Sequence, residues 1–208
     1  MAKSTSKKVL RKIYGMGRGW TFSAIDFSTF GNRSAIDITL HRLSGKGTIR
    51  RVIRGIYDYP RFSATLNTQL SPNMDQVAQA LARKFGWHVQ PGAETALNIL
   101  GLSTQVPAQW IYRSDGPNRT YNIGQQTLAF EHAMLKETGF RLRESALIVH
   151  ALRTLESRRV SDESIGKIRD WLDPAKRALV LQDTRTTTGW IYEAIRKICR
   201  KENSGTNR

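Results

Sequence analysis

Apolar residues recur with a helical period near the start of the chain. Over residues 7–16 they fall on one face of a helix, and Lys and Arg fall on the other. The glycines that follow, Gly15, Gly17 and Gly19, predict the end of this helix. A short second helix is expected to begin after Thr21 or Ser23, either of which can cap it, and to run to Phe27.

A third helix is predicted to begin after Asn32 or Ser34, both of which are capping residues, and to end at Gly45 or Gly47. Its expected core face consists of Ala35, Ile36, Leu40 and Leu43. The outward-facing residues are then Arg33, Ser34, Asp37, His41 and Arg42.

Two strands are predicted next, over residues 48–53 and 56–59, because apolar residues there are interleaved with arginine. A tight Arg54-Gly55 turn would join them, with the glycine supplying a positive φ. We expect Arg50, Arg51 and Arg54 to project toward solvent or a ligand. The order of helix, helix, turn, helix and ribbon is that of a winged helix-turn-helix, whose last helix fits the major groove of DNA.

The expected fold class is therefore α+β, with a winged helix-turn-helix domain over residues 1–61 and a mixed α/β domain over residues 62–202. Residues 203–208 are expected to be a disordered tail. Within the second domain, residues 62–72 are predicted to form a loop and residues 75–85 a helix. Runs rich in Trp, Ile and Tyr predict a hairpin around Asp115–Asn118, and helices are expected from residue 144.

Charge distribution favours a polyanionic partner for the first domain. The net charge of the chain is +16, and residues 1–61 contain 13 Lys and Arg against 3 Asp and Glu. From residue 196 onward there are 5 basic residues and 1 acidic residue, so residues 62–195 are close to neutral. Such an asymmetry indicates binding to nucleic acid more than general solubility. A purely solvated charged face is the alternative interpretation.

Motifs for catalysis are weak in this sequence. Lys46 lacks the upstream glycine and the following Ser or Thr of a phosphate loop, and the four histidines have no metal-ligand spacing. Cys199 is the single cysteine. Asp170, Asp173 and Asp183 favour helix caps and solvated faces over a Mg²⁺ site. We expect no enzyme activity, no cofactor and no metal. No apolar run is long enough to span a membrane, no signal peptide is recognised, and a cytoplasmic location is expected.

Aromatic residues in the middle of the chain allow two interpretations. They could stack on single-stranded bases, or they could pack inside the predicted hairpin, which is the commoner use. These residues are Trp110, Tyr112 and Tyr121.

Three sequence blocks resemble the AbiEi-type antitoxins of type IV toxin–antitoxin and abortive-infection modules, in the form with an N-terminal winged helix. The blocks are "FGNRSAIDITLHRL", "GTIRRVIRGIYDYP" and "GLSTQVPAQWIYRSDGPNRTYNIGQQT". The likeness covers nearly the whole chain. It departs from the family pattern at Asn32, where Ser is usual.

The resemblance implies an antitoxin that binds inverted repeats in its own promoter and counters a nucleotidyltransferase-fold toxin, which it touches in some family members. It also implies phage defence, and a DNA-reading helix that starts at Asn32. Dimerisation or cooperative binding on DNA is an open expectation. The alternative is a protein-interaction module whose basic ribbon contacts an acidic surface on its partner.

Each candidate DNA contact has an expected role. Arg33 is expected to reach guanine or a phosphate, and Asp37 to accept from cytosine or to orient Arg33. Five cations are expected to neutralise phosphates, which gives a slope of log K against log salt of about −4 to −5. The candidate DNA-binding residues are Asn32, Arg33, Ser34, Asp37, His41, Arg42, Lys46, Arg50, Arg51 and Arg54.

Overall fold

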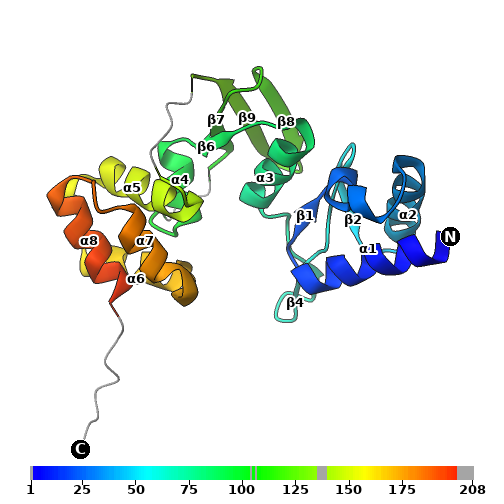
Figure 1. The fold of residues 1–208 in the computed structure, drawn as a ribbon, viewed down its shortest axis with the longest axis horizontal. Coiled ribbons are helices and arrows are strands. Elements are labelled where there is room, and N and C mark those ends of the chain that lie inside the picture. Colours follow the sequence, from blue (N-terminus) through cyan, green and yellow to red (C-terminus); the bar gives the residue numbers. More distant parts are fainter. Residues whose placement is uncertain (1, 104, 106, 135–139, 201–208) are drawn as a thin grey trace, which may run out of the picture. The chain divides into compact units, whose positions relative to one another are not determined.

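The computed structural model describes residues 2–103, 105, 107–134 and 140–200 (Figure 1). The chain is an α+β protein with small antiparallel sheets, as expected. It forms two compact units, of which the first comprises Met1–Val89 with Ser114–His132 and the second Gln90–Arg113 with Ala133–Arg208. The predicted domain boundary at residue 61 falls inside the first unit. The predicted tail over residues 203–208 lies outside the described residues.

Three helices at the start of the first unit confirm the helical periodicity of the sequence. They are α1 (Ala2–Met16), the 3-10 helix η1 (Ala24–Phe30) and α2 (Arg33–Gly45). After α1 the chain turns at Gly17, whose φ of 82° is accessible to glycine at little cost. Of the two possible caps for α2, the structure uses Asn32, whose side-chain oxygen accepts a hydrogen bond from Ala35 N at 2.8 Å.

A three-stranded antiparallel sheet adjoins these helices in the first unit. Its strands are β1 (Thr21–Phe22), β2 (Arg50–Ile53) and β3 (Ile56–Asp58), in the order β1-β3-β2. The predicted turn between β2 and β3 is present, and Gly55 has a φ of 77°. The register shifts between Arg51 and Ile53, which is the signature of a β-bulge.

Aromatic side chains fill the core between the helices and this sheet. Phe22 and Phe27 are fully buried, and their rings meet edge to face with centroids 5.4 Å apart. The ring of Trp20 lies 4.7 Å from that of Phe22. The aliphatic members of the same core are Val9, Ile13, Ile36, Leu40, Leu43 and Ile49.

Residues 62–85 also belong to the first unit. The predicted loop over residues 62–72 contains a small hairpin formed by β4 (Phe62–Ser63) and β5 (Thr68–Gln69). The predicted helix follows as α3 (Met74–Phe85), capped by Asn73, whose side chain accepts from Gln76 N at 3.0 Å.

Arg83 attaches α3 to the elements near the start of the chain. Its Nε lies 2.7 Å from a carboxylate oxygen of Asp26, and its Nη2 donates to the carbonyl oxygen of Thr21 at 2.9 Å. The same Asp26 carboxylate accepts from Ser23 N at 2.8 Å. One carboxylate therefore both caps η1 and holds α3.

The first unit is completed by β8 (Arg119–Ile123) and β9 (Gln126–His132), which pair with each other in antiparallel register. The prediction of a hairpin around Asp115–Asn118 is wrong, because β8 pairs with β9 across Gly124 and Gln125. The segment before β8 is held by contacts with residues 87 and 88. Asp115 accepts a hydrogen bond from His88 N at 2.8 Å. A Cβ at Gly116 would lie 2.4 Å from the Trp87 ring, so only glycine fits there.

The second unit is mostly helical. The chain passes between the units at β6 (Val89–Pro91) and at β7 (Gln109–Ser114), which are neighbouring strands. The helices of this unit pack around a core that includes Leu147, Ile148, Leu152, Ile168 and Ile195. They are α4 (Ala93–Ile99), α5 (Arg143–Leu155), η2 (Ser157–Arg159), α6 (Asp162–Trp171), η3 (Pro174–Lys176), α7 (Arg177–Asp183) and α8 (Gly189–Cys199). None of the helices described has the length and apolar content needed to cross a membrane.

Candidate nucleic-acid interface

The outer face of α2 is open to solvent. Its inner face buries Ile36, Leu40 and Leu43, so residues on the opposite side of the 3.6-residue period must face outward. Ile38 is 49 % exposed and places an apolar side chain among the polar ones. The candidate residues exposed along this helix and its ends are Asn32, Arg33, Ser34, Asp37, His41, Arg42 and Lys46.

Arg33 and Asp37 form an ion pair one turn apart on this face. The Arg33 Nε donates to the Asp37 carboxylate at 2.8 Å, and the two side chains are 69 % and 51 % exposed. An exposed pair at this spacing stabilises a helix by only about 0.3–0.5 kcal/mol. The main effect of the pair is to orient the Arg33 guanidinium. Asp37 binds its Nε, and the two terminal nitrogens are left for another acceptor.

The β2–β3 hairpin presents two further arginines. Arg51 and Arg54 are both exposed, and neither forms an ion pair within the described chain. Val52 is the additional residue of the bulge, and it is half-buried. The bulge and the glycine turn thus bring two unpaired guanidinium groups to the end of one short hairpin.

The expectation that Arg50 projects toward a ligand is wrong, because its guanidinium group is bound within the protein. It stands opposite Asp58 in the register of β2 and β3, and its Nε and Nη2 lie 3.0 and 2.5 Å from the two oxygens of that carboxylate. Its Nη1 donates to Leu70 O at 3.0 Å. Consecutive strand residues point to opposite faces, so Arg50 and Arg51 do not share one. With every guanidinium nitrogen engaged, Arg50 is a structural residue.

One cation beyond residue 61 adjoins the same hairpin, and the sequence did not single it out. Lys84, in the last turn of α3, donates to the carbonyl oxygen of Arg54 at 3.3 Å. Burial lowers the pKa of Lys84, and the positive charges of Arg33, Arg54 and Arg119 lower it further. The positive charges of Arg33 in α2 and Arg54 in the hairpin thus act on the same lysine. The only sequence signal was a basic last turn, which is common at helix C-termini.

Aromatic residues in the middle of the chain are used for packing. Tyr112 is fully buried. The Tyr121 ring meets the Phe130 ring edge to face at 6.0 Å. Trp110 is half-buried. These contacts agree with the packing interpretation, although the hairpin that was expected to contain them does not form.

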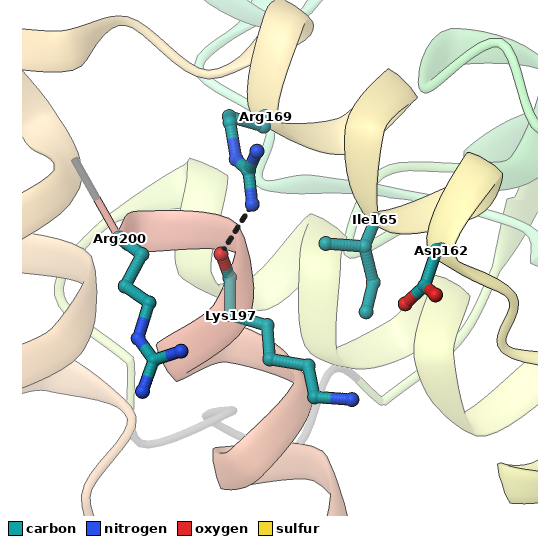
Figure 2. Close-up of a pocket in the computed structure, with 5 residues that line it drawn as sticks. All are labelled: Asp162, Ile165, Arg169, Lys197 and Arg200. Carbon is teal, nitrogen blue, oxygen red and sulfur yellow. Dashed lines mark hydrogen bonds between the residues drawn. The ribbon is translucent and has the colours of Figure 1, made fainter. Parts of the chain in front are cut away.

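A pocket of about 260 Å³ lies between α6 and the end of α8 in the second unit. Figure 2 shows the Arg169 guanidinium directed at the carbonyl oxygen of Lys197, which it reaches at 2.7 Å. Arg169 also donates to the carbonyl oxygen of Ile198 at 3.2 Å. A cation on the last carbonyls of a helix is stabilising, so Arg169 has a structural role here. The lining residues are Asp162, Ile165, Arg169, Lys197 and Arg200.

Groups with catalytic potential are placed for structure. Asp173 caps η3 by accepting from Ala175 N, as predicted, whereas Asp183 caps no helix and accepts from the backbone N–H groups of Arg141 and Leu142, just before α5. Burial raises the pKa of the Cys199 thiol to about 11, although the positive charges of Arg177 and Arg169 oppose the shift. Burial likewise lowers the pKa of His150, with Arg113 and Arg153 adding to the effect. Among the residues that the structure describes, no three His, Cys, Asp or Glu side chains are grouped to hold a metal ion.

Together the fold and the site define an α+β protein whose first unit exposes an open helix face beside an arginine-bearing hairpin. The chain belongs to a family described as a family of unknown function, DUF6088, whose model matches residues 8–179. No curated protein and no solved structure matches the chain.

Proposed function

We propose that this chain is a DNA-binding antitoxin that represses the promoter of its own operon and counters a nucleotidyltransferase-fold toxin. In this proposal η1 and α2 are the helix-turn-helix, and the β2–β3 hairpin is the wing. The order of elements from α1 to β3 and the sheet order β1-β3-β2 support this assignment, because they place a two-stranded ribbon directly after the reading helix.

The observation that carries the proposal is the open face of α2 next to unpaired arginines. A protein that reads DNA needs donors free for bases and phosphates, and internal ion pairs would remove them. Arg51 and Arg54 have no ion pair in the described chain, and the terminal nitrogens of Arg33 remain free of Asp37.

Each side chain then has a distinct role. Arg33 binds O6 and N7 of a guanine in the major groove through its terminal nitrogens, and Asp37 orients it. Phosphate neutralisation falls to four cations, since Arg50 is engaged by Asp58. These four, Arg42, Lys46, Arg51 and Arg54, predict a slope of log K against log salt of about −3.6.

Titrations of the promoter duplex and a shuffled duplex, at several salt concentrations, test the DNA part of this proposal. Arg33→Ala is expected to relax sequence preference, with about 1–3 kcal/mol of discrimination lost. Arg51→Ala is expected to weaken binding to both duplexes equally and to flatten the salt slope by about 0.9. Equal binding of the unaltered protein to both duplexes would contradict specific repression.

Expression beside the nucleotidyltransferase of the same operon tests the antitoxin part. Growth arrest by the nucleotidyltransferase is expected to be relieved when this chain is also made. Copurification of the two proteins distinguishes direct contact from an indirect effect. Relief of growth arrest by a protein that binds no DNA would favour an interaction module over a repressor.

A further inference from the structure

Lys84 and Arg119 both lie over one ring of a stacked aromatic pair in the first unit. The rings of Phe85 and Trp87 are stacked, with centroids 4.7 Å apart and planes inclined by 23°. The Lys84 ammonium lies 5.1 Å from the Phe85 centroid, and the Arg119 guanidinium lies 5.2 Å from the same centroid. One ring thus holds two cations that are 35 residues apart in the chain.

Lys84 also adjoins the end of the β2–β3 hairpin. Lys84 donates to Arg54 O at 3.3 Å, and a Cβ built on Gly55 would lie 2.9 Å from the Lys84 nitrogen. Residues from the hairpin, the end of α3 and the start of β8 therefore meet around Lys84. All belong to the first unit.

This cluster concentrates positive charge without a compensating carboxylate. Neither Lys84 nor Arg119 forms an ion pair in the described part of the chain, and Arg54 forms none either. The lowered pKa of Lys84 has burial as its largest cause and the charges of Arg33, Arg54 and Arg119 as further causes. Like charges held together repel, and a bound anion would relieve that repulsion.

We propose that Lys84 and Arg119, together with Arg54, bind the phosphate backbone of duplex DNA beside the wing. This inference rests on the proposed DNA binding and extends it to residues outside the first 61. The contacts with Phe85 place the two cations, and the hydrogen bond to Arg54 fixes Lys84 against the hairpin. Lys84 contributes a point charge, whereas Arg119 can bind two phosphate oxygens with its planar fork.

A single-stranded ligand fits this surface less well than a duplex. Base stacking needs an open aromatic face. The faces of Phe85 are occupied by Trp87, Lys84 and Arg119. Trp87 is additionally covered by Gly116, because a Cβ there would lie 2.4 Å from its ring. Arg119 is exposed, Lys84 is half-buried and Phe85 keeps 38 % of its surface exposed, so the charged groups that a ligand can reach here are the two cations, which suit phosphates.

Salt-dependent titration of promoter duplex with Lys84→Gln and Arg119→Gln tests the inference in the full chain. Two further phosphate contacts steepen the expected slope of the unaltered protein from about −3.6 to about −5.4. Each substitution should remove about 0.9 from that slope and weaken binding about eightfold at 0.1 M salt, equally for promoter and shuffled duplex. Arg119→Lys and Lys84→Arg should retain most of the affinity.

Lys167→Gln is the matched control, because it removes one charge that Glu163 already neutralises at 2.8 Å in the second unit. It should leave the slope unchanged. If the unaltered protein binds its promoter specifically while both glutamine variants keep the native slope, the inference fails and the proposed function stands. If the unaltered protein binds no duplex, both fail. Loss of thermal stability in Arg119→Gln, with affinity also lost in Arg119→Lys, would assign Arg119 a structural role and overturn its part in binding.

Discussion

Arg50 and Asp58 face each other in adjacent antiparallel strands, and the arginine binds both oxygens of the carboxylate. Asp58 is 2 % exposed, so its charge has almost no access to water. The third arginine nitrogen binds Leu70 O, which joins the sheet to the segment after β5. This pair connects three parts of the first unit with one guanidinium group.

Replacement of Asp58 by Ala is expected to destabilise the first unit by about 3–5 kcal/mol, because Arg50 is left without its partner in a poorly hydrated position. Amide hydrogen exchange in β1 and β3 measures the effect within this unit. Asp37→Ala removes an exposed carboxylate of the same unit and should cost less than about 0.5 kcal/mol. Equal protection factors in the two variants would contradict a structural role for Asp58.

Arg83→Ala is expected to destabilise the first unit by about 1.5–3 kcal/mol, the usual value for a hydrogen bond to a charged group. The substitution leaves the Asp26 carboxylate without its cation and the carbonyl oxygen of Thr21 without this donor. Urea denaturation gives the measurement. Arg51→Ala, which removes an exposed and unpaired arginine, serves as the control and should change stability little.

Gly55→Ala is expected to destabilise the hairpin by about 1–2 kcal/mol, because alanine rarely adopts a φ of 77° and its Cβ would lie 2.9 Å from the Lys84 nitrogen. Gly45→Ala is the contrasting variant. Gly45 lies in α2, and an added methyl group there would have no heavy atom within 4 Å, so helix propensity should stabilise that variant slightly. Thermal denaturation midpoints that shift the same way in both would refute the turn argument.

Acid should weaken the second unit through Asp183. Burial raises the pKa of this carboxyl, but hydrogen bonds from Arg141 N and Leu142 N outweigh burial and the net pKa is lowered. A lowered pKa in the folded state means that the stabilisation is present above the unfolded-state value of about 3.9 and is lost as pH falls through the folded-state value. Asp183→Asn should therefore be less stable than the unaltered chain at pH 7, and the difference should shrink only as pH falls below about 3.9, toward the lower folded-state pKa. A constant difference from pH 7 to pH 3 would rule this out.

Cys199 should react with thiol reagents only after unfolding. Its thiol is buried and its pKa is about 11, so the reactive thiolate is scarce at neutral pH. Modification by a chromogenic disulfide at pH 8 is expected to be slow in buffer and complete within minutes in denaturant. Rapid modification of the folded protein would show that α8 opens readily.

Local signals in the sequence sufficed for helices, caps and the hairpin turn. The Asn32 cap, the Gly55 turn and the buried face of α2 each depend on residues within one turn or one period. The cap and the turn were confirmed, and so were three of the four core residues predicted for α2, since only Ala35 is half-buried. The finer assignment of these elements to a winged helix-turn-helix stays a proposal.

Pairings between distant residues were beyond the sequence patterns. A run rich in Trp, Ile and Tyr identified β8 as a strand but not β9 as its partner, since the composition of a strand contains no pairing information. Arg50 was expected to project toward a ligand together with Arg51, although neighbouring residues of a strand point to opposite faces of the sheet. Lys84 lies against the hairpin because α3 packs on β1 and η1, and this tertiary packing has no local sequence signal.

Because the first unit is assembled from residues before 90 and residues after 113, no single proteolytic cut or stop codon can release it whole. During synthesis, its leading elements leave the ribosome well before β8 and β9 exist. Residues 90–113 of the other unit emerge in between. Fragments that end near residue 61 therefore lack both α3 and Arg119, and a minimal folding version of this unit would require the two stretches to be joined by an engineered linker.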